Sequence, residues 1–206
     1  MTKEISNERF SIFPCGWKRE DGKVKMNQWP QQTQTIGWVY EWIRSPWCAV
    51  EATIGYRAML PTASREQKNN FKLEHFQYAT FSGIFTYRKE EKLVTRTPFL
   101  TIDIDHLDSL EEARDVQQTL CQDTEVVTAL CFVSPSARGV KWILELPKWT
   151  EGKPFKEQFD MMRDYVSFNY GLDADKSGSD VCRACFLGWD PDCFVNPKYV
   201  LPHNLY

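Results

Sequence analysis

The chain has 206 residues, of which 42% are hydrophobic and 14% aromatic, enough for one large domain or two closely packed subdomains. It has no apolar stretch long enough to span a membrane, and its N-terminus, MTKEISNERF, lacks the apolar core of a secretory signal, so we expect a cytoplasmic protein with its seven cysteines reduced. Residues 1–98 carry 15 Lys and Arg against 10 Asp and Glu, whereas residues 99–206 carry 10 against 18. A basic half suits a phosphate backbone and an acidic half suits a metal site, although chance variation explains the difference equally well.

Residues 1–98 predict a basic N-terminal subdomain that mixes strands and helices. The expected elements are a strand over 9–14, helices over 35–47 and 49–60, a helix or exposed connection over 62–74, and a β-rich aromatic segment over 75–88. Thr35 is a candidate N-cap, and Gly83 marks a candidate bulge.

Residues 99–206 predict a second subdomain with the order β-α-β-β-α-β, packed with the first as one integrated domain. The expected elements are a strand at FLTIDID, a helix begun by a capping box at Ser109 and Glu112, strands over 126–133 and 140–146, a helix over 155–171 ended by Gly171, and a strand over 181–189. The fold class expected from this pattern is α+β.

The stretch FLTIDIDHLD, residues 99–108, carries Asp103 and Asp105 at alternate positions of a buried strand. Side chains two apart on a strand point to the same face, roughly 7 Å apart. Two carboxylates this close oppose each other's ionisation unless a cation lies between them, and Mg²⁺ or Mn²⁺ prefers carboxylate oxygen. The pair predicts a divalent metal site, with acids that are solvated or paired with Arg or Lys as the alternative. Asp108 fits the start of the next helix, and His106, on the opposite face, fits a packed or surface role.

The predicted hairpin turn SPSARGVK places two hydroxyls and two cations within eight residues. A tight turn exposes backbone N–H groups that bind anions, and Ser134, Ser136, Arg138 and Lys141 would complete a phosphate cradle. An ordinary hydrophilic hairpin is the alternative.

The segment GLDADKSGSDVCR offers three further acids, Asp173, Asp175 and Asp180, followed by Arg183. One of these acids can complete a three-carboxylate metal site, and Arg183 can neutralise a phosphate. A solvated acidic loop is the alternative.

Together these motifs resemble the archaeo-eukaryotic primase, or prim-pol, superfamily. The pattern is a strand ending in D-x-D, an S-P-S-x-x-G-x-K hairpin, a helix ending in Y-G, a D-x-S-G-x-D segment, an Arg and a W-D-P turn. Within the superfamily, the chain is most similar to the N-terminal domain of virulence-associated E-type helicase proteins of mobile elements, and ATFSGIFTYR, residues 79–88, shares this likeness. The resemblance covers roughly residues 9–197.

The resemblance implies a two-subdomain fold with a ferredoxin- or RRM-like sheet and a catalytic cleft between the subdomains. It implies that Asp103, Asp105 and Asp175 bind catalytic Mg²⁺ or Mn²⁺, with Asp173 and Asp180 as alternatives for the third acid. Ser134, Ser136 and the end of the hairpin would hold a nucleoside triphosphate, assisted by Arg183. The chain departs from the superfamily pattern at Lys141, which stands where a His is usual, and at Ala137 and Arg138, where the loop is often Gly-rich.

The activity implied is two-metal nucleotidyl transfer on a single-stranded DNA template, in mobile-element replication. In this hypothesis Arg138, Lys141 and Arg183 offset the developing negative charge. Four aromatic residues of the basic half are candidates for base stacking, although a place in the core explains them better: Trp38, Trp42, Phe76 and Tyr78.

Two other functions remain open on the sequence. The chain is either an enzyme or a non-catalytic module that binds nucleotide or single-stranded DNA beside a helicase, and a metal-dependent nuclease is a third reading. No G-x-x-x-x-G-K-[ST] motif is present, so a helicase would be on another chain or in a longer parent protein. Cys182, Cys185 and Cys193 with His203 form a rival zinc set, disfavoured because residues three apart on a strand face opposite sides.

Overall fold

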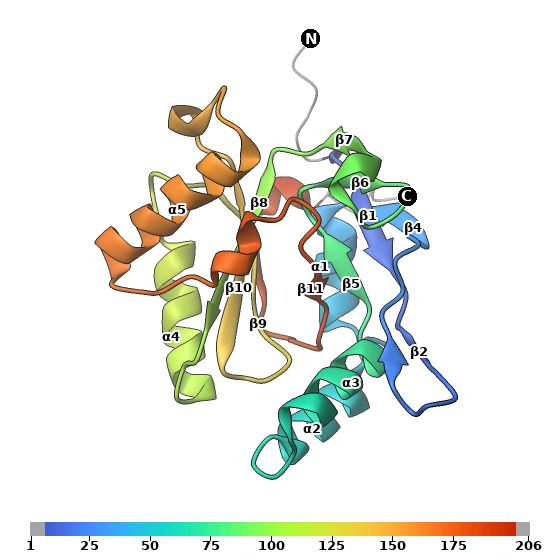
Figure 1. Cartoon of the computed structure of the whole chain (residues 1–206). Coiled ribbons are helices and arrows are strands. Elements are labelled where there is room, and N and C mark those ends of the chain that lie inside the picture. The colour runs from blue at the N-terminus through green and yellow to red at the C-terminus, as the bar shows by residue number, and fades with distance from the viewer. Residues whose placement is uncertain (1–6, 201–206) are drawn as a thin grey trace, which may run out of the picture.

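Two antiparallel four-stranded sheets form the framework of the protein, and the computed structural model describes residues 7–200 (Figure 1). The first sheet has the order β11-β5-β1-β4, with β11 at Cys185–Phe186, β5 at Tyr78–Thr80, β1 at Phe10–Phe13 and β4 at Gln32–Gln34. The second has the order β12-β9-β10-β8, with β12 at Phe194–Val195, β9 at Thr128–Val133, β10 at Gly139–Glu145 and β8 at Phe99–Asp105. The protein is therefore of the α+β class, as the sequence predicts.

Two small ribbons and several short helical turns complete the strand framework. The ribbons pair β2 (Trp17–Lys18) with β3 (Val24–Lys25), and β6 (Gly83–Phe85) with β7 (Leu93–Arg96). The short turns of 3-10 helix are η2 (Glu90–Lys92), η3 (Lys148–Thr150), η4 (Lys176–Ser179) and η5 (Pro197–Tyr199). The β6–β7 register shifts between Ile84 and Phe85, next to the predicted bulge at Gly83.

Within residues 7–200, five α-helices pack around the sheets. They are α1 (Ile36–Arg44), α2 (Val50–Met59), α3 (Arg65–His75), α4 (Leu110–Cys121) and α5 (Phe155–Tyr170). Local chemistry sets their ends: the Thr35 hydroxyl caps α1, and Ser64 forms a capping box with Gln67 at the start of α3. Gly171 ends α5 in the left-handed conformation, as predicted. The segment left open as a helix or a connection is thus mostly the helix α3.

Strand β8 separates two hydrophobic clusters. Its even-numbered residues Leu100, Ile102 and Ile104 pack with α4 and α5 on one face of the second sheet. Phe99, on the other face, packs with α1 and β1 between the two sheets. Because strand side chains alternate, Asp103 and Asp105 lie on the same face as Phe99, toward the N-terminal half of the chain.

Two local predictions need correction. The strand expected over 181–189 is limited to Cys185–Phe186, because the chain turns through 181–184. This short strand pairs with β5 of the first sheet, and β12 instead joins the second sheet. The capping box at Ser109 is half formed, since the Glu112 carboxylate accepts from the backbone N–H of Asp108 rather than of Ser109.

No helix within residues 7–200 is long and apolar enough to cross a membrane.

Gly139 at the start of β10 allows the hairpin to approach β8 closely. A Cβ there would lie 2.5 Å from the carbonyl oxygen of Ile104 and 2.9 Å from Oδ1 of Asp105. We expect Gly139→Ala to lower the free energy of unfolding by about 1–3 kcal/mol, measured by urea denaturation. Gly55→Ala is the matched control, because its Cβ would meet only Phe71, at 3.7 Å, and alanine favours a helix by up to about 1 kcal/mol. Equal effects of the two substitutions would contradict this account.

Candidate functional site

Strand β8 and its neighbour β10 place two acids and a lysine together on one face of the second sheet. In the antiparallel register, Lys141 lies directly opposite Asp103, and Gly139 lies opposite Asp105. The Lys141 ammonium forms an ion pair with Asp103 Oδ2 and lies 3.9 Å from Asp105 Oδ1. The alternation of the strands therefore brings all three charges to one point.

Asp175 reaches the same point from the segment after α5. Its backbone N–H donates to the Asp103 carbonyl at 2.9 Å, and the preceding Ala174 bridges to Ile104 of β8. One carboxylate oxygen of each of Asp103, Asp105 and Asp175 lies within 4.8 Å of the other two. Within residues 7–200 this is the one group of acidic, His or Cys side chains close enough to share a metal ion. Asp173 and Asp180, the alternatives for the third acid, lie outside it and are exposed.

The Asp175 carboxylate is held by local donors. It accepts from the N–H of Ser177 at 3.0 Å and from its hydroxyl at 2.5 Å, and it pairs with Arg183 at 3.0 Å. Burial opposes ionisation, but the Ser177 hydrogen bonds and the Arg183 charge outweigh it and lower the pKa of Asp175. The third acid therefore stays ionised.

Asp103 is in a different environment, because it is only 8% exposed and incompletely paired. Oδ2 contacts Lys141, whereas Oδ1 is buried and has no hydrogen-bond partner in the described part of the chain. Burial, with Asp105 nearby, raises the pKa of Asp103, while Lys141 acts in the opposite sense. Burial would lower the pKa of Lys141, but the two acids outweigh it and raise that pKa, so the lysine stays protonated.

These residues fit a divalent cation. A buried carboxylate oxygen without a donor costs free energy, and a hard cation would satisfy it. Three carboxylates supply the oxygen ligands that Mg²⁺ and Mn²⁺ prefer. The donor set and the unpaired oxygen of Asp103 thus agree in kind with the metal expected from the sequence.

The hairpin turn lies beside the carboxylates and is internally bonded. The Ser134 and Ser136 hydroxyls lie 2.9 Å apart, and the backbone N–H of Arg138 donates to Ser136 at 3.3 Å. Ala137 between them is left-handed, with φ 59°. Both hydroxyls border the pocket that Asp103 and Asp105 line, whereas Arg138 is exposed and borders an adjacent pocket instead.

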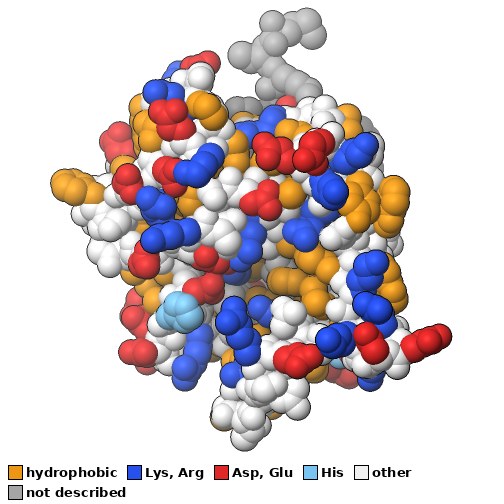
Figure 2. Space-filling model, viewed as in Figure 1, with side chains coloured by type: hydrophobic (Ala, Val, Ile, Leu, Met, Phe, Trp, Pro, Cys, Tyr) orange, Lys and Arg blue, Asp and Glu red, His pale blue; other side chains and the backbone are white. Residues whose placement is uncertain are grey.

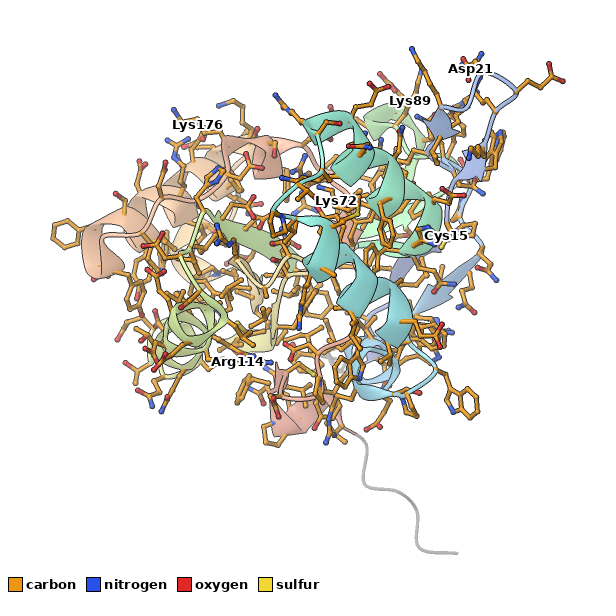
Figure 3. All side chains as sticks on the ribbon, turned by 90° about the horizontal axis from the view of Figure 1, so that it is seen from below. Cys15, Asp21, Lys72, Lys89, Arg114 and Lys176 are labelled. Carbon is orange, nitrogen blue, oxygen red and sulfur yellow. The ribbon has the colours of Figure 1, made fainter. Side chains whose placement is uncertain are left out.

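Asp103, Asp105 and Lys141 line a pocket of about 950 Å³ whose other charged lining is mostly basic, with Glu66 as its one further acid. Helix α3 contributes Arg65, Lys68 and Lys72 to it, and Arg88 and Arg183 add two guanidinium groups. Figure 2 shows Lys and Arg side chains around a recess on this face, and Figure 3 shows Lys72 on α3 near the middle of the view from below. Burial, and then the nearby Lys141 charge, lower the pKa of Lys72.

Sequence reasoning did not identify the basic face of α3. The detectable signal was the spacing of Arg65, Lys68 and Lys72 at i, i+3 and i+7, which places three cations on one face of a helix. The excess of Lys and Arg in residues 1–98 indicated a basic surface in this half of the chain but did not show which residues form it.

A second pocket of about 790 Å³ adjoins the first. Lys68, Asp105 and Ser136 border both pockets. The second pocket adds Arg57, Arg138 and His106, with Leu60 and Pro61 among its apolar lining. Asp105 therefore lies at the junction of two cation-lined spaces.

The aromatic candidates from the sequence border neither pocket. Phe76 and Tyr78 are buried, which confirms the core interpretation for these two. Trp38 and Trp42 stack with ring centroids 5.4 Å apart and are partly buried against the core rather than within it. His106 is exposed.

Of the rival zinc set, His203 lies outside the described residues. The Cys182 thiol donates to Asp180 at 3.0 Å.

The fold and site define an α+β protein with a three-carboxylate cluster at the edge of a cation-lined pocket. The family described as BT4734-like, N-terminal domain, matches residues 71–194, which is more than half of the chain and includes β8, the hairpin and Asp175. The chain belongs to this family. No curated protein and no solved structure matches it significantly.

The pairing of Asp175 predicts pH-dependent stability. Folding lowers the pKa of Asp175. The ionised carboxylate therefore adds to the free energy of unfolding at a pH above its unfolded-state pKa of about 4, and this stabilisation is lost as the pH falls through its pKa in the folded state. In EDTA, Asp175→Ala should cost about 1–2 kcal/mol by urea denaturation at about pH 7, and distinctly less at about pH 3. Asp173→Ala, in the same segment but exposed, should change stability by less than about 0.5 kcal/mol. A cost for Asp175→Ala that is independent of pH would contradict the assignment.

Proposed function

We propose that this chain is a primase-polymerase-like nucleotidyltransferase that uses divalent metals to add nucleotides on a single-stranded DNA template, in mobile-element replication. The observation that supports this most is the convergence of Asp103, Asp105 and Asp175, with a buried unpaired oxygen on Asp103. Asp103 and Asp105 line a pocket whose other charged lining is mostly basic. The motif resemblance to prim-pol proteins and the matched family, which is associated with VirE-like, primase-related domains, support this proposal.

The residues of the first pocket suit a metal-bound triphosphate. Asp103, Asp105 and Asp175 would hold divalent cations, which when bound would lower the pKa of an attacking 3′-hydroxyl and neutralise the phosphates. Lys72 and Arg183 border the pocket and can contact phosphate oxygens that extend away from the acids. Ser134 and Ser136 supply hydroxyls at the hairpin side.

The second pocket suits the strand to be extended. Arg57, Lys68 and Arg138 offer charges for a phosphate backbone, and Leu60 and Pro61 offer apolar contacts for sugar or base. A nucleotide in the first pocket and a strand in the second would meet at Asp105, which borders both. Nucleotidyl transfer requires this meeting of a triphosphate with a 3′-hydroxyl beside a carboxylate cluster.

A non-catalytic module that binds nucleotide or single-stranded DNA is the second candidate. The ion pairs of Asp103 with Lys141 and of Asp175 with Arg183 favour it, because they already neutralise two of the three acids. A helicase on another chain or in a longer parent protein would then be its partner.

Asp103→Asn separates the two functions. We expect wild-type protein to bind a deoxynucleoside triphosphate with Mn²⁺ in calorimetry and to extend a primer on a single-stranded template. We expect the variant to lose roughly 100-fold or more of the extension rate, since it loses a metal-binding charge.

Asp173→Asn is the control, because Asp173 is exposed and outside the cluster, and it should retain extension. Metal-dependent nucleotide binding without extension would favour the module. Degradation of single-stranded DNA without added nucleotide would favour a nuclease. Absence of nucleotide binding with either Mn²⁺ or EDTA would contradict the nucleotidyltransferase and favour a non-catalytic module that binds single-stranded DNA.

The second pocket predicts a salt-dependent effect on DNA binding. Arg138→Ala should weaken binding of a single-stranded oligonucleotide and reduce the slope of log affinity against log salt by roughly 1, because one phosphate contact is lost. Lys89→Ala, an exposed cation that borders neither pocket, should leave the slope nearly unchanged. Fluorescence anisotropy across a salt series measures the affinity and its slope for each protein. Equal slopes for Arg138→Ala and wild type would contradict a DNA-binding role for the second pocket.

A further inference from the structure

Lys141 places its ammonium beside two of the three acids that are proposed to bind the metal. Its ammonium is paired with Asp103 Oδ2 and lies 3.9 Å from Asp105 Oδ1, and its side chain is only 12% exposed. The β8–β10 register fixes this placement, because Lys141 is the residue directly opposite Asp103. Among residues 7–200, Lys141 is the only cationic side chain at ion-pair distance from Asp103.

A divalent cation bound by these acids would meet that ammonium directly. The same Asp103 carboxylate would have to serve both cations, and a fixed positive charge would repel the incoming ion. Lys141 has a flexible four-carbon stem, so its ammonium can leave Asp103 and remain in the pocket that it lines. A triphosphate in that pocket would give the released ammonium new oxygen partners.

We propose that Lys141 is a tethered counter-ion that competes with the divalent metal for Asp103, and that metal entry releases its ammonium to bind phosphate. The inference rests on the proposed function, because it assumes a metal and a triphosphate at this site. In this proposal Lys141 is a positioning residue that pairs with Asp103 before the metal binds and with phosphate afterwards. Metal and triphosphate therefore bind cooperatively, with part of their coupling carried by one side chain.

Mn²⁺ titration without nucleotide tests the competition. Lys141→Gln removes the charge and keeps a hydrogen-bond donor, and we expect it to bind Mn²⁺ roughly tenfold or more tightly than wild type by electron paramagnetic resonance. Lys141→Arg keeps the charge and should bind Mn²⁺ about as wild type does. Lys72→Gln is the matched control: it removes a charge from the same pocket, but Lys72 forms no ion pair with the three acids in the described structure, so its effect should be much smaller.

The second half of the proposal is tested with tripolyphosphate. Its affinity is measured with and without Mn²⁺, and the ratio gives the coupling between the two ligands. We expect a larger ratio for wild type than for Lys141→Gln, because only wild type has an ammonium to release. Equal ratios would overturn this half.

A titration of wild-type protein observes the Lys141 ammonium itself, and a variant is needed only to assign its signal. The side-chain ammonium signal of Lys141 in nitrogen-15 NMR, identified by its loss in Lys141→Arg, should shift on addition of Mg²⁺ far more than the signal of Lys72. An unshifted signal at saturating Mg²⁺ would overturn the competition.

The outcomes distinguish this inference from the proposed function. If wild type binds Mn²⁺ and Lys141→Gln binds it no more tightly, Lys141 arranges the acids rather than competing, and the inference alone is wrong. If neither wild type nor Lys141→Gln binds Mn²⁺, the metal site is wrong, and both proposals fail.

Discussion

The two-residue repeat of strand β8 is the constraint on which both the core and the candidate site depend. Its even-numbered residues are buried under α4 and α5, and this burial fixes which face the odd-numbered residues present. Phe99 then enters the core between the sheets, while Asp103 and Asp105 face the pocket. A slip of one residue would expose the apolar set and bury both acids under the helices, so the same burial that stabilises the sheet also positions the carboxylates.

Two buried acids of this protein illustrate different solutions to the cost of burying charge. Asp190 is fully paired: its carboxylate accepts from the Val133 N–H at 2.7 Å and forms an ion pair with Arg114, as a structural acid should. Asp103 has a lysine on one oxygen and nothing among the described residues on the other. This incomplete pairing costs stability, and natural proteins retain such costs where a site has a ligand to bind.

The sequence was informative where local chemistry decides structure. The alternation in β8, the turn between β9 and β10, and Gly171 at the end of α5 were all predictable from short-range patterns. Residue chemistry left Asp173, Asp175 and Asp180 open as the third acid, and the family resemblance favoured Asp175. The bridge between Ala174 and Ile104, a contact between distant segments that no short-range pattern predicts, places Asp175 in the cluster. The basic face of α3 escaped notice because a mostly polar helix has no buried residue to mark its orientation. The strand expected over 181–189 was overestimated because its apolar residues are buried in turns as well as in β11.

The exchange of strands by the C-terminal segment has a mechanical consequence. After Asp175, the chain adds β11 to the first sheet and then β12 to the second, so one short segment is hydrogen-bonded to both sheets. A continuous apolar layer with residues from β1, α1, β8 and β9 fills the space between them. Large apolar interfaces of this kind resist hinge motion. The two sheets should therefore behave as one rigid body, and adjustment of the pocket is expected mainly at α3, which has no buried residue.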